Sequence, residues 1–149
     1  MTQIRRPRDF QRQRLYDAER SIRAWRRKKD YFPTKSRTSR FVYGVCLDPW
    51  TVRKFGRPSA PNTFYPGETT DPATGCSYEL VLPNWAHFKL VLLHEIAHSL
   101  TQWQHGWPNV SNHGPEFASI FLALTYRFMG ERDGDQLLNA YEEHTVKYV

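Results

Sequence analysis

The segment 85–103 constrains the fold more than any other part of the chain. Its apolar residues recur around most of the circumference of a helix, which predicts a buried, central helix; they are Phe88, Val91, Leu92, Leu93, Ile96, Ala97 and Leu100. Two histidines and a glutamate nevertheless stand at its centre, in the sequence His94-Glu95-Ile96-Ala97-His98. Because burying such polar groups costs free energy unless they find partners, the segment predicts a binding site.

The spacing of the two histidines indicates what they bind. Histidines four residues apart on a helix project from the same face, so His94 and His98 can each offer a ring nitrogen to one Zn²⁺ ion. Glu95 stands beside this pair, where its carboxylate can take a proton from a metal-activated water molecule. The motif therefore predicts two metal ligands and a general base. The alternative is a pair of hydrogen-bonded histidines in the protein core.

A catalytic zinc site needs a third protein ligand and one open position. Three residues downstream of the motif qualify, namely His105, His113 and Glu116. Thr101 and Gln104 stand where metzincins have glycine and histidine, which excludes that class. Thermolysin-like sites take their third ligand from a glutamate on the following helix, so Glu116 remains a candidate. We favour His113, because it ends a loop that can fold back over the first two ligands.

The remaining sequence predicts a mixture of helices and strands. Apolar residues at helical spacing predict further helices at 9–29, 115–129 and from Asp133 or Asp135 to about His144. Alternating or apolar runs predict strands at 40–47 and 76–82, with shorter extended pieces at 52–55 and 63–65. We expect Asp9 to cap the first helix. This order favours an α+β fold, with an N-terminal helix, a small, mostly antiparallel sheet packed on helix 85–103, and C-terminal helices.

Charge divides the chain into two predicted parts. Residues 1–40 hold 14 Lys and Arg against 4 Asp and Glu, whereas residues 41–149 are net acidic. We therefore expect a basic N-terminal helix and loop over 1–40 and the functional core over 41–149. Such an asymmetry suggests that the basic arm contacts a nucleic acid. The alternative is a solvated helix face with no acidic partner.

Length and composition exclude several classes of protein. A chain of 149 residues with 40% hydrophobic residues has room for one domain with a core of its own. It has no apolar run long enough to cross a membrane and no apolar stretch after its charged start that would mark a secretory signal. Two cysteines, Cys46 and Cys76, are too few for a disulfide scaffold, so we expect a cytoplasmic protein.

Together, two motifs resemble a known family. The sequence HEIAH, followed by His113-Gly114-Pro115-Glu116-Phe117, resembles the SprT-like (Spartan-type) metallopeptidase core over about residues 76–129. The resemblance implies a zincin-like domain whose zinc ligands are His94, His98 and His113, with Glu95 as general base. It also implies that Gly114 allows a close approach at the loop end and that Phe117 packs under the site.

A second resemblance extends over most of the chain. The segments PRDFQRQRLYDAE, ELVLPNW and HGPEF are similar to those of small, uncharacterised actinobacterial HExxH metallohydrolases. Spartan-type proteins commonly add a C-terminal zinc ribbon that helps to bind DNA, but no cysteine follows Cys76 here. DNA-triggered proteolysis is therefore not carried over to this sequence.

The sequence thus predicts a zinc metallopeptidase that hydrolyses peptide bonds in a protein or peptide substrate. DNA-associated proteins are one class of substrate that the basic arm would suit. The alternative is a non-catalytic, zinc-containing protein that binds nucleic acid or a larger assembly. A fourth side chain on the metal would favour this alternative, and a position open to water would favour an enzyme.

Overall fold

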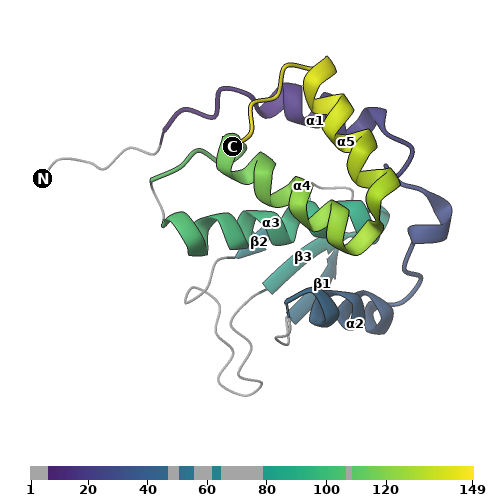
Figure 1. Ribbon diagram of the computed structural model, residues 1–149. Coiled ribbons are helices and arrows are strands. Elements are labelled where there is room, and N and C mark those ends of the chain that lie inside the picture. Colours follow the sequence, from purple (N-terminus) through teal and green to yellow (C-terminus); the bar gives the residue numbers. More distant parts are fainter. Residues whose placement is uncertain (1–6, 47–50, 56–61, 65–78, 107–108) are drawn as a thin grey trace, which may run out of the picture. The chain divides into compact units, whose positions relative to one another are not determined.

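The computed structural model describes residues 7–46, 51–55, 62–64, 79–106 and 109–149 (Figure 1). Its helices are α1 (Arg12–Ser21), α2 (Lys35–Cys46), α3 (Lys89–His105), α4 (Pro115–Met129) and α5 (Glu131–Glu143). Two short 3₁₀ helices are η1 (Lys28–Asp30) and η2 (Asn84–Ala86). The strands are β1 (Thr51–Phe55), β2 (Asn62–Phe64) and β3 (Glu79–Pro83). The chain divides into two compact units, Met1–Trp25 with Leu100–Val149, and Arg26–Ser99.

In the first unit, α5 packs against both α1 and α4 (Figure 1). Apolar side chains from the three helices and the last residues form its core; they are Leu15, Ala18, Ile22, Phe117, Ala118, Phe121, Leu137, Ala140, Tyr141 and Val146. Pro115 begins α4, where its missing N–H costs no hydrogen bond. Gly130 separates α4 from α5 with a φ of 100°, a conformation that glycine adopts without strain.

The C-terminal residues of the first unit are tied to its helices. The side-chain amide of Gln11, which is 1% exposed, makes two hydrogen bonds with the backbone of Lys147. Its Nε2 donates to the carbonyl oxygen at 2.9 Å, and its Oε1 accepts from the backbone N–H at 2.8 Å. The Ser119 hydroxyl likewise accepts from and donates to the backbone of Val149. The last residues of the chain are therefore fixed to the beginning of α1 and to α4.

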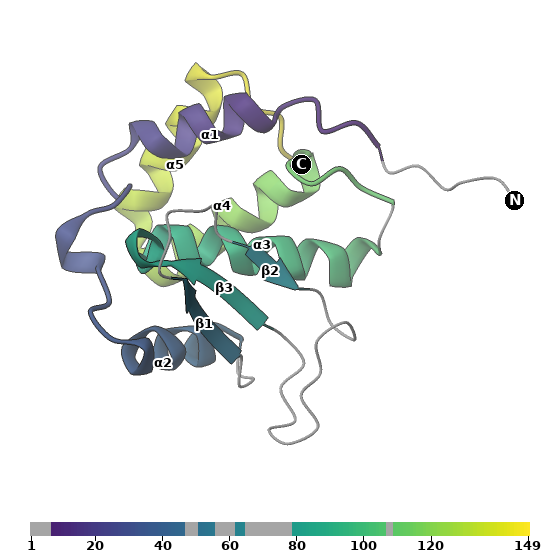
Figure 2. The same ribbon diagram turned by 180° about the vertical axis from the view of Figure 1, so that it is seen from behind.

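The second unit contains a three-stranded sheet in the order β1-β3-β2 (Figure 2). β3 pairs with β1 in parallel and with β2 in antiparallel orientation, and α2 packs beside β1. The buried apolar residues of this unit are Val42, Leu80, Leu82, Ala86, Leu90, Val91, Leu92, Leu93, Ile96 and Ala97. Most of them belong to α3, in agreement with the prediction of a buried helix there.

The predicted α+β, zincin-like fold class is wrong. Helices dominate the described residues, with lengths of 10, 12, 17, 15 and 13 residues, whereas the strands have 5, 3 and 5. The sheet is also not mostly antiparallel, because its longer pair, β1 with β3, is parallel. Two antiparallel strands can be joined by a tight hairpin, whereas two parallel strands need a long connection. The connection from β1 to β3 is long because β2 lies between them in the sequence, and it therefore permits parallel pairing.

The strand predicted at 40–47 is also wrong, because residues 35–46 form α2. Thr38 and Val42 are the buried residues of this helix, one turn apart, while Tyr43 is 53% exposed. The alternation of bulky residues that suggested a strand therefore does not match the face that is buried. Packing against β1 decides the conformation over local preference.

Several other elements have bounds that differ from the predicted ones. Helix α1 covers Arg12–Ser21, which is the middle of the predicted 9–29, and Gln11 rather than Asp9 stands at its N-cap position. The predicted strand 76–82 appears as β3, and residues 76–78 lie outside the described residues. The helix at 115–129 is confirmed, and the last helix starts at Glu131. In the described part of the chain, no helix combines the length and the hydropathy that membrane crossing requires.

Candidate metal centre

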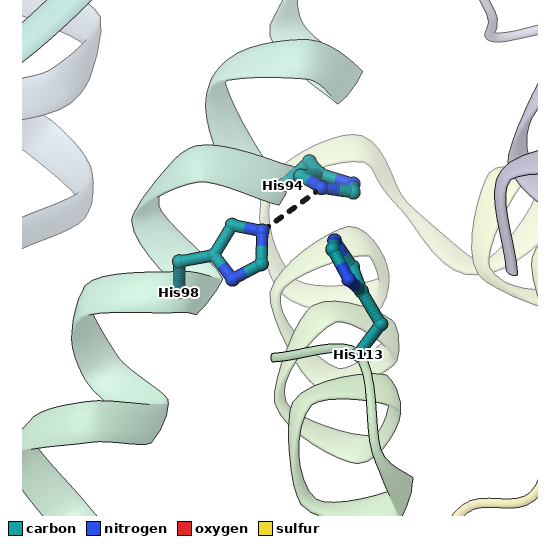
Figure 3. A group of neighbouring side chains, drawn as sticks. All are labelled: His94, His98 and His113. Atoms are coloured by element: carbon teal, nitrogen blue, oxygen red, sulfur yellow. Dashed lines mark hydrogen bonds between the residues drawn. The ribbon is translucent and has the colours of Figure 1, made fainter. Parts of the chain in front are cut away.

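Helix α3 presents His94 and His98 from successive turns of the same face (Figure 3). Their Nε2 atoms lie 3.2 Å apart, and their ring centroids are 4.9 Å apart with the planes at 70°. Residues 90–97 of α3 are all buried, and His94 is only 5% exposed, whereas His98 is half-buried. The helix therefore holds the two imidazoles in a T-shaped arrangement, with His94 shielded from most water and His98 half-exposed.

His113 lies two residues before α4, near the end of the segment that follows α3. Its ring makes T-shaped contacts with Phe117, at a centroid distance of 5.2 Å, and with Tyr16, at 5.0 Å. Phe117 lies one turn into α4, which agrees with the packing role that the family resemblance implies for it. His113 is 5% exposed, and aromatic side chains contact its ring on two sides.

The three histidines converge (Figure 3). One ligand nitrogen from each of His94, His98 and His113 lies within 4.8 Å of the others. In a tetrahedral site with metal–nitrogen distances of about 2.0–2.1 Å, ligand nitrogens are separated by about 3.3 Å. The Nε2 atoms of His94 and His98 are hydrogen-bonded at 3.2 Å, and the same separation fits this spacing. The three residues thus suit a metal ion, and the donor set consists of imidazoles alone.

A carboxylate holds His113 from the other side. Asp9 Oδ2 lies 2.8 Å from His113 Nδ1, and Asp9 Oδ1 accepts a hydrogen bond from the backbone N–H of His113 at 3.1 Å. Burial raises the pKa of Asp9, but the hydrogen bonds and charge of His113, with the charge of Arg12, hold that pKa below its usual value. Asp9 is therefore ionised at neutral pH and acts only as an acceptor.

Glu95 is the second acidic group near the histidines. Its Oε1 lies 4.0 Å from Nε2 of His94, which is one of the nitrogens that can hold a metal ion. The side chain is 8% exposed, so the carboxylate sits in surroundings that contain little water. A carboxylate at this distance can receive a proton from a water molecule beside the ligand nitrogens.

The other candidate ligands do not join this group. His105 is the last residue of α3 and Glu116 is the second residue of α4, both half-buried. Among the described residues, the cluster of possible metal ligands contains neither of them. Tyr126, a tyrosine of the same helix as Glu116, lies about 16 Å along α4 from Pro115. Its hydroxyl donates to Asp135 at 2.6 Å, which raises the pKa of Tyr126 to about 12.

Sequence reasoning assigned no role in the site to Asp9 or Tyr16. Asp9 was expected to cap a helix, and its contact with His113 joins positions 104 residues apart in the sequence. No local pattern reports such a contact. The only signal available was that Asp9 is one of four acidic residues in the basic arm.

The chain matches no known protein family, no curated protein and no solved structure. The resemblances to SprT-like and actinobacterial metallohydrolases therefore remain predictions.

Gly114 offers a test of how closely the backbone must approach the site. A Cβ atom added at Gly114 would collide with the hydroxyl of the buried Ser111 and lie 3.1 Å from Glu116 Oε2. We expect Gly114→Ala to shift His113 and to weaken zinc binding by about 10-fold, the lower end of the range for changes around metal ligands. Competition with a chelating dye measures the affinity.

A second substitution checks the cause. In Gly114→Ala combined with Ser111→Ala, the colliding hydroxyl is gone and the nearest Ser111 atom is a Cβ at 3.6 Å, so part of the affinity should return. Gly44→Ala is the matched control, because a Cβ there meets nothing within 4 Å. Wild-type zinc affinity in Gly114→Ala would show that the close approach is not needed.

Proposed function

We propose that the chain is a zinc-dependent hydrolase that cleaves peptide bonds. His94, His98 and His113 would hold the ion, and Glu95 would act as the general base. The observation that carries this proposal is the convergence of three imidazole nitrogens within 4.8 Å, with a buried carboxylate 4.0 Å from one of them.

The donor set supports zinc and a catalytic use of it. Imidazole suits zinc and other late transition metals, whereas calcium and magnesium prefer oxygen ligands. Three protein ligands are the number found in catalytic zinc sites, where the fourth position is open to water or substrate. When bound in such a site, zinc lowers the pKa of water to about 7 and polarises a carbonyl group.

The chain's own residues would do the rest of the chemistry. Glu95 takes a proton from the attacking water molecule, and the same carboxylate can later deliver it to the departing amine. The buried setting of Glu95 and His94 keeps bulk water from competing for these hydrogen bonds. The histidines keep their positions through α3 and through the contacts of His113.

The substrate we propose is a protein or peptide, and the basic arm gives one indication of its class. Arg12, Arg20 and Arg23 are exposed on or beside α1 and can contact phosphates. DNA-associated proteins are therefore candidate substrates. The same arginines support the second candidate function, a non-catalytic, zinc-containing protein that binds nucleic acid or an assembly.

Metal removal tests the proposed function directly. We expect the zinc-loaded protein to cleave members of a mixed peptide library, the chelated protein to cleave none, and added Zn²⁺ to restore cleavage. Mass spectrometry of the library identifies the cleaved bonds. Mg²⁺ at the same concentration is the matched control and should restore nothing, because the imidazole donors do not suit it.

The other outcomes separate the two candidate functions. One zinc ion per chain without cleavage of any peptide would contradict the peptidase and favour the binding protein. Failure to bind zinc at all would contradict both functions.

A further inference from the structure

We propose that Asp9 is a positioning residue of the metal centre, whose carboxylate fixes both the orientation and the tautomer of the ligand His113. This deepens the proposed function and rests on the metal site described there. Asp9 would touch neither the metal nor the substrate and would act through His113 alone.

Both carboxylate oxygens of Asp9 contact His113. Oδ2 is 2.8 Å from the ring nitrogen Nδ1, and Oδ1 is 3.1 Å from the backbone nitrogen. An ionised carboxylate only accepts hydrogen bonds, so Nδ1 must carry the proton in this contact. In a neutral ring the other nitrogen, Nε2, is then left with a lone pair. This is the form in which a histidine binds a metal through Nε2.

Neighbouring rings restrict the orientation further. Tyr16 and Phe117 both meet the His113 ring edge to face, with interplanar angles of 72° and 74°. These contacts oppose rotation of the ring about its Cβ–Cγ bond, while the hydrogen bond to Asp9 selects one of its two flipped orientations. A metal ligand held in this way pays little entropy when the ion binds.

Asp9 is itself well anchored. It precedes α1 by a short segment that includes Gln11, whose amide is clamped to the backbone of Lys147 by two hydrogen bonds. The Asp9 side chain is 21% exposed, so its hydrogen bonds are partly shielded from water. The residue is thus held where it can orient a ligand, rather than reaching the site from a free terminus.

Substitution of Asp9 by asparagine tests the proposal. In Asp9→Asn the amide oxygen can still accept from the backbone N–H, which leaves the NH₂ group facing Nδ1. That group donates, and so it favours the tautomer in which Nε2 carries the proton and cannot bind a metal. We expect zinc affinity to fall by about 10- to 100-fold, the usual cost of losing such a partner.

The readouts are zinc affinity and the tautomer, neither of which depends on hydrolysis. A chelating dye that competes for Zn²⁺ gives the affinity, and ¹⁵N NMR of the metal-free protein, at a pH where the ring is neutral, gives the protonated nitrogen of His113. Asp9→Glu keeps the carboxylate and should recover part of the affinity. Asp17→Asn is the matched control, since it removes the same charge from an exposed position on α1 and should change neither readout.

Two results would overturn the proposal. One is an Asp9→Asn variant that binds zinc as tightly as the wild type. The other is a wild-type, metal-free His113 that carries its proton on Nε2, a measurement that needs no variant and so holds even if Asp9→Asn folds poorly. If zinc binding responds to Asp9 but no peptide is cleaved, the positioning role stands and the peptidase function fails.

Discussion

The Glu95→Gln variant is expected to lose peptide hydrolysis by about 10²- to 10⁴-fold, the usual contribution of a general acid or base, while it still binds zinc. Glutamine has nearly the shape of glutamate, so the packing of this buried side chain and the positions of the histidines should persist. Its amide cannot take a proton from water. Rates on a cleaved library peptide and metal analysis of the same sample give both quantities.

Glu116→Gln is the matched control for this variant. It removes a half-buried glutamate that lies outside the histidine cluster, so rate and zinc content should stay at wild-type levels. A Glu95→Gln enzyme with wild-type turnover would remove Glu95 from the mechanism. Loss of zinc from Glu116→Gln would instead mark Glu116 as a ligand.

His113→Ala should produce the largest loss of metal. It removes one of three converging ligands, so we expect zinc affinity to fall by more than about 100-fold, beyond the cost of losing an outer partner such as Asp9. The fold should persist in large part, because the core of the unit that contains His113 is formed by α1, α4 and α5 rather than by the His113 ring. Competition titration measures the affinity, and circular dichroism checks the helices.

His105→Ala provides the comparison, since it removes a histidine from the end of α3 that does not join the cluster. Its zinc affinity should equal that of the wild type. The reverse pattern, with tight binding by His113→Ala and weak binding by His105→Ala, would assign the third ligand to His105. Unchanged binding in both variants would leave the cluster without a role in metal binding.

Features encoded over a few residues were predictable. The buried helix α3 follows from its apolar positions, and the pairing of His94 with His98 follows from their spacing on it. Pro115 and Gly130 mark the two ends of α4 because each suits one end of a helix for a stereochemical reason. The loop position of His113, two residues before α4, indicated that it can reach the other two histidines.

Features decided by packing were not predictable in the same way. Phe41, Tyr43 and Val45 favour a strand by their intrinsic preference, yet they belong to α2, which packs beside β1. The parallel pairing of β1 with β3 also depends on partners distant in the sequence. In such segments the free energy gained by burial in tertiary contacts exceeds the local conformational preference. The fold class predicted from local preference was therefore wrong.

The contact between Asp9 and His113 has a consequence for the order of events during biosynthesis. Because 104 residues separate the two, a ribosome adding about 5–20 residues per second completes Asp9 about 5–20 s before His113. Gln11 must wait longer still for Lys147. The carboxylate that positions the third ligand is therefore synthesised first, with 104 residues between it and that ligand. Coordination by all three histidines can then begin only after His113 has been synthesised.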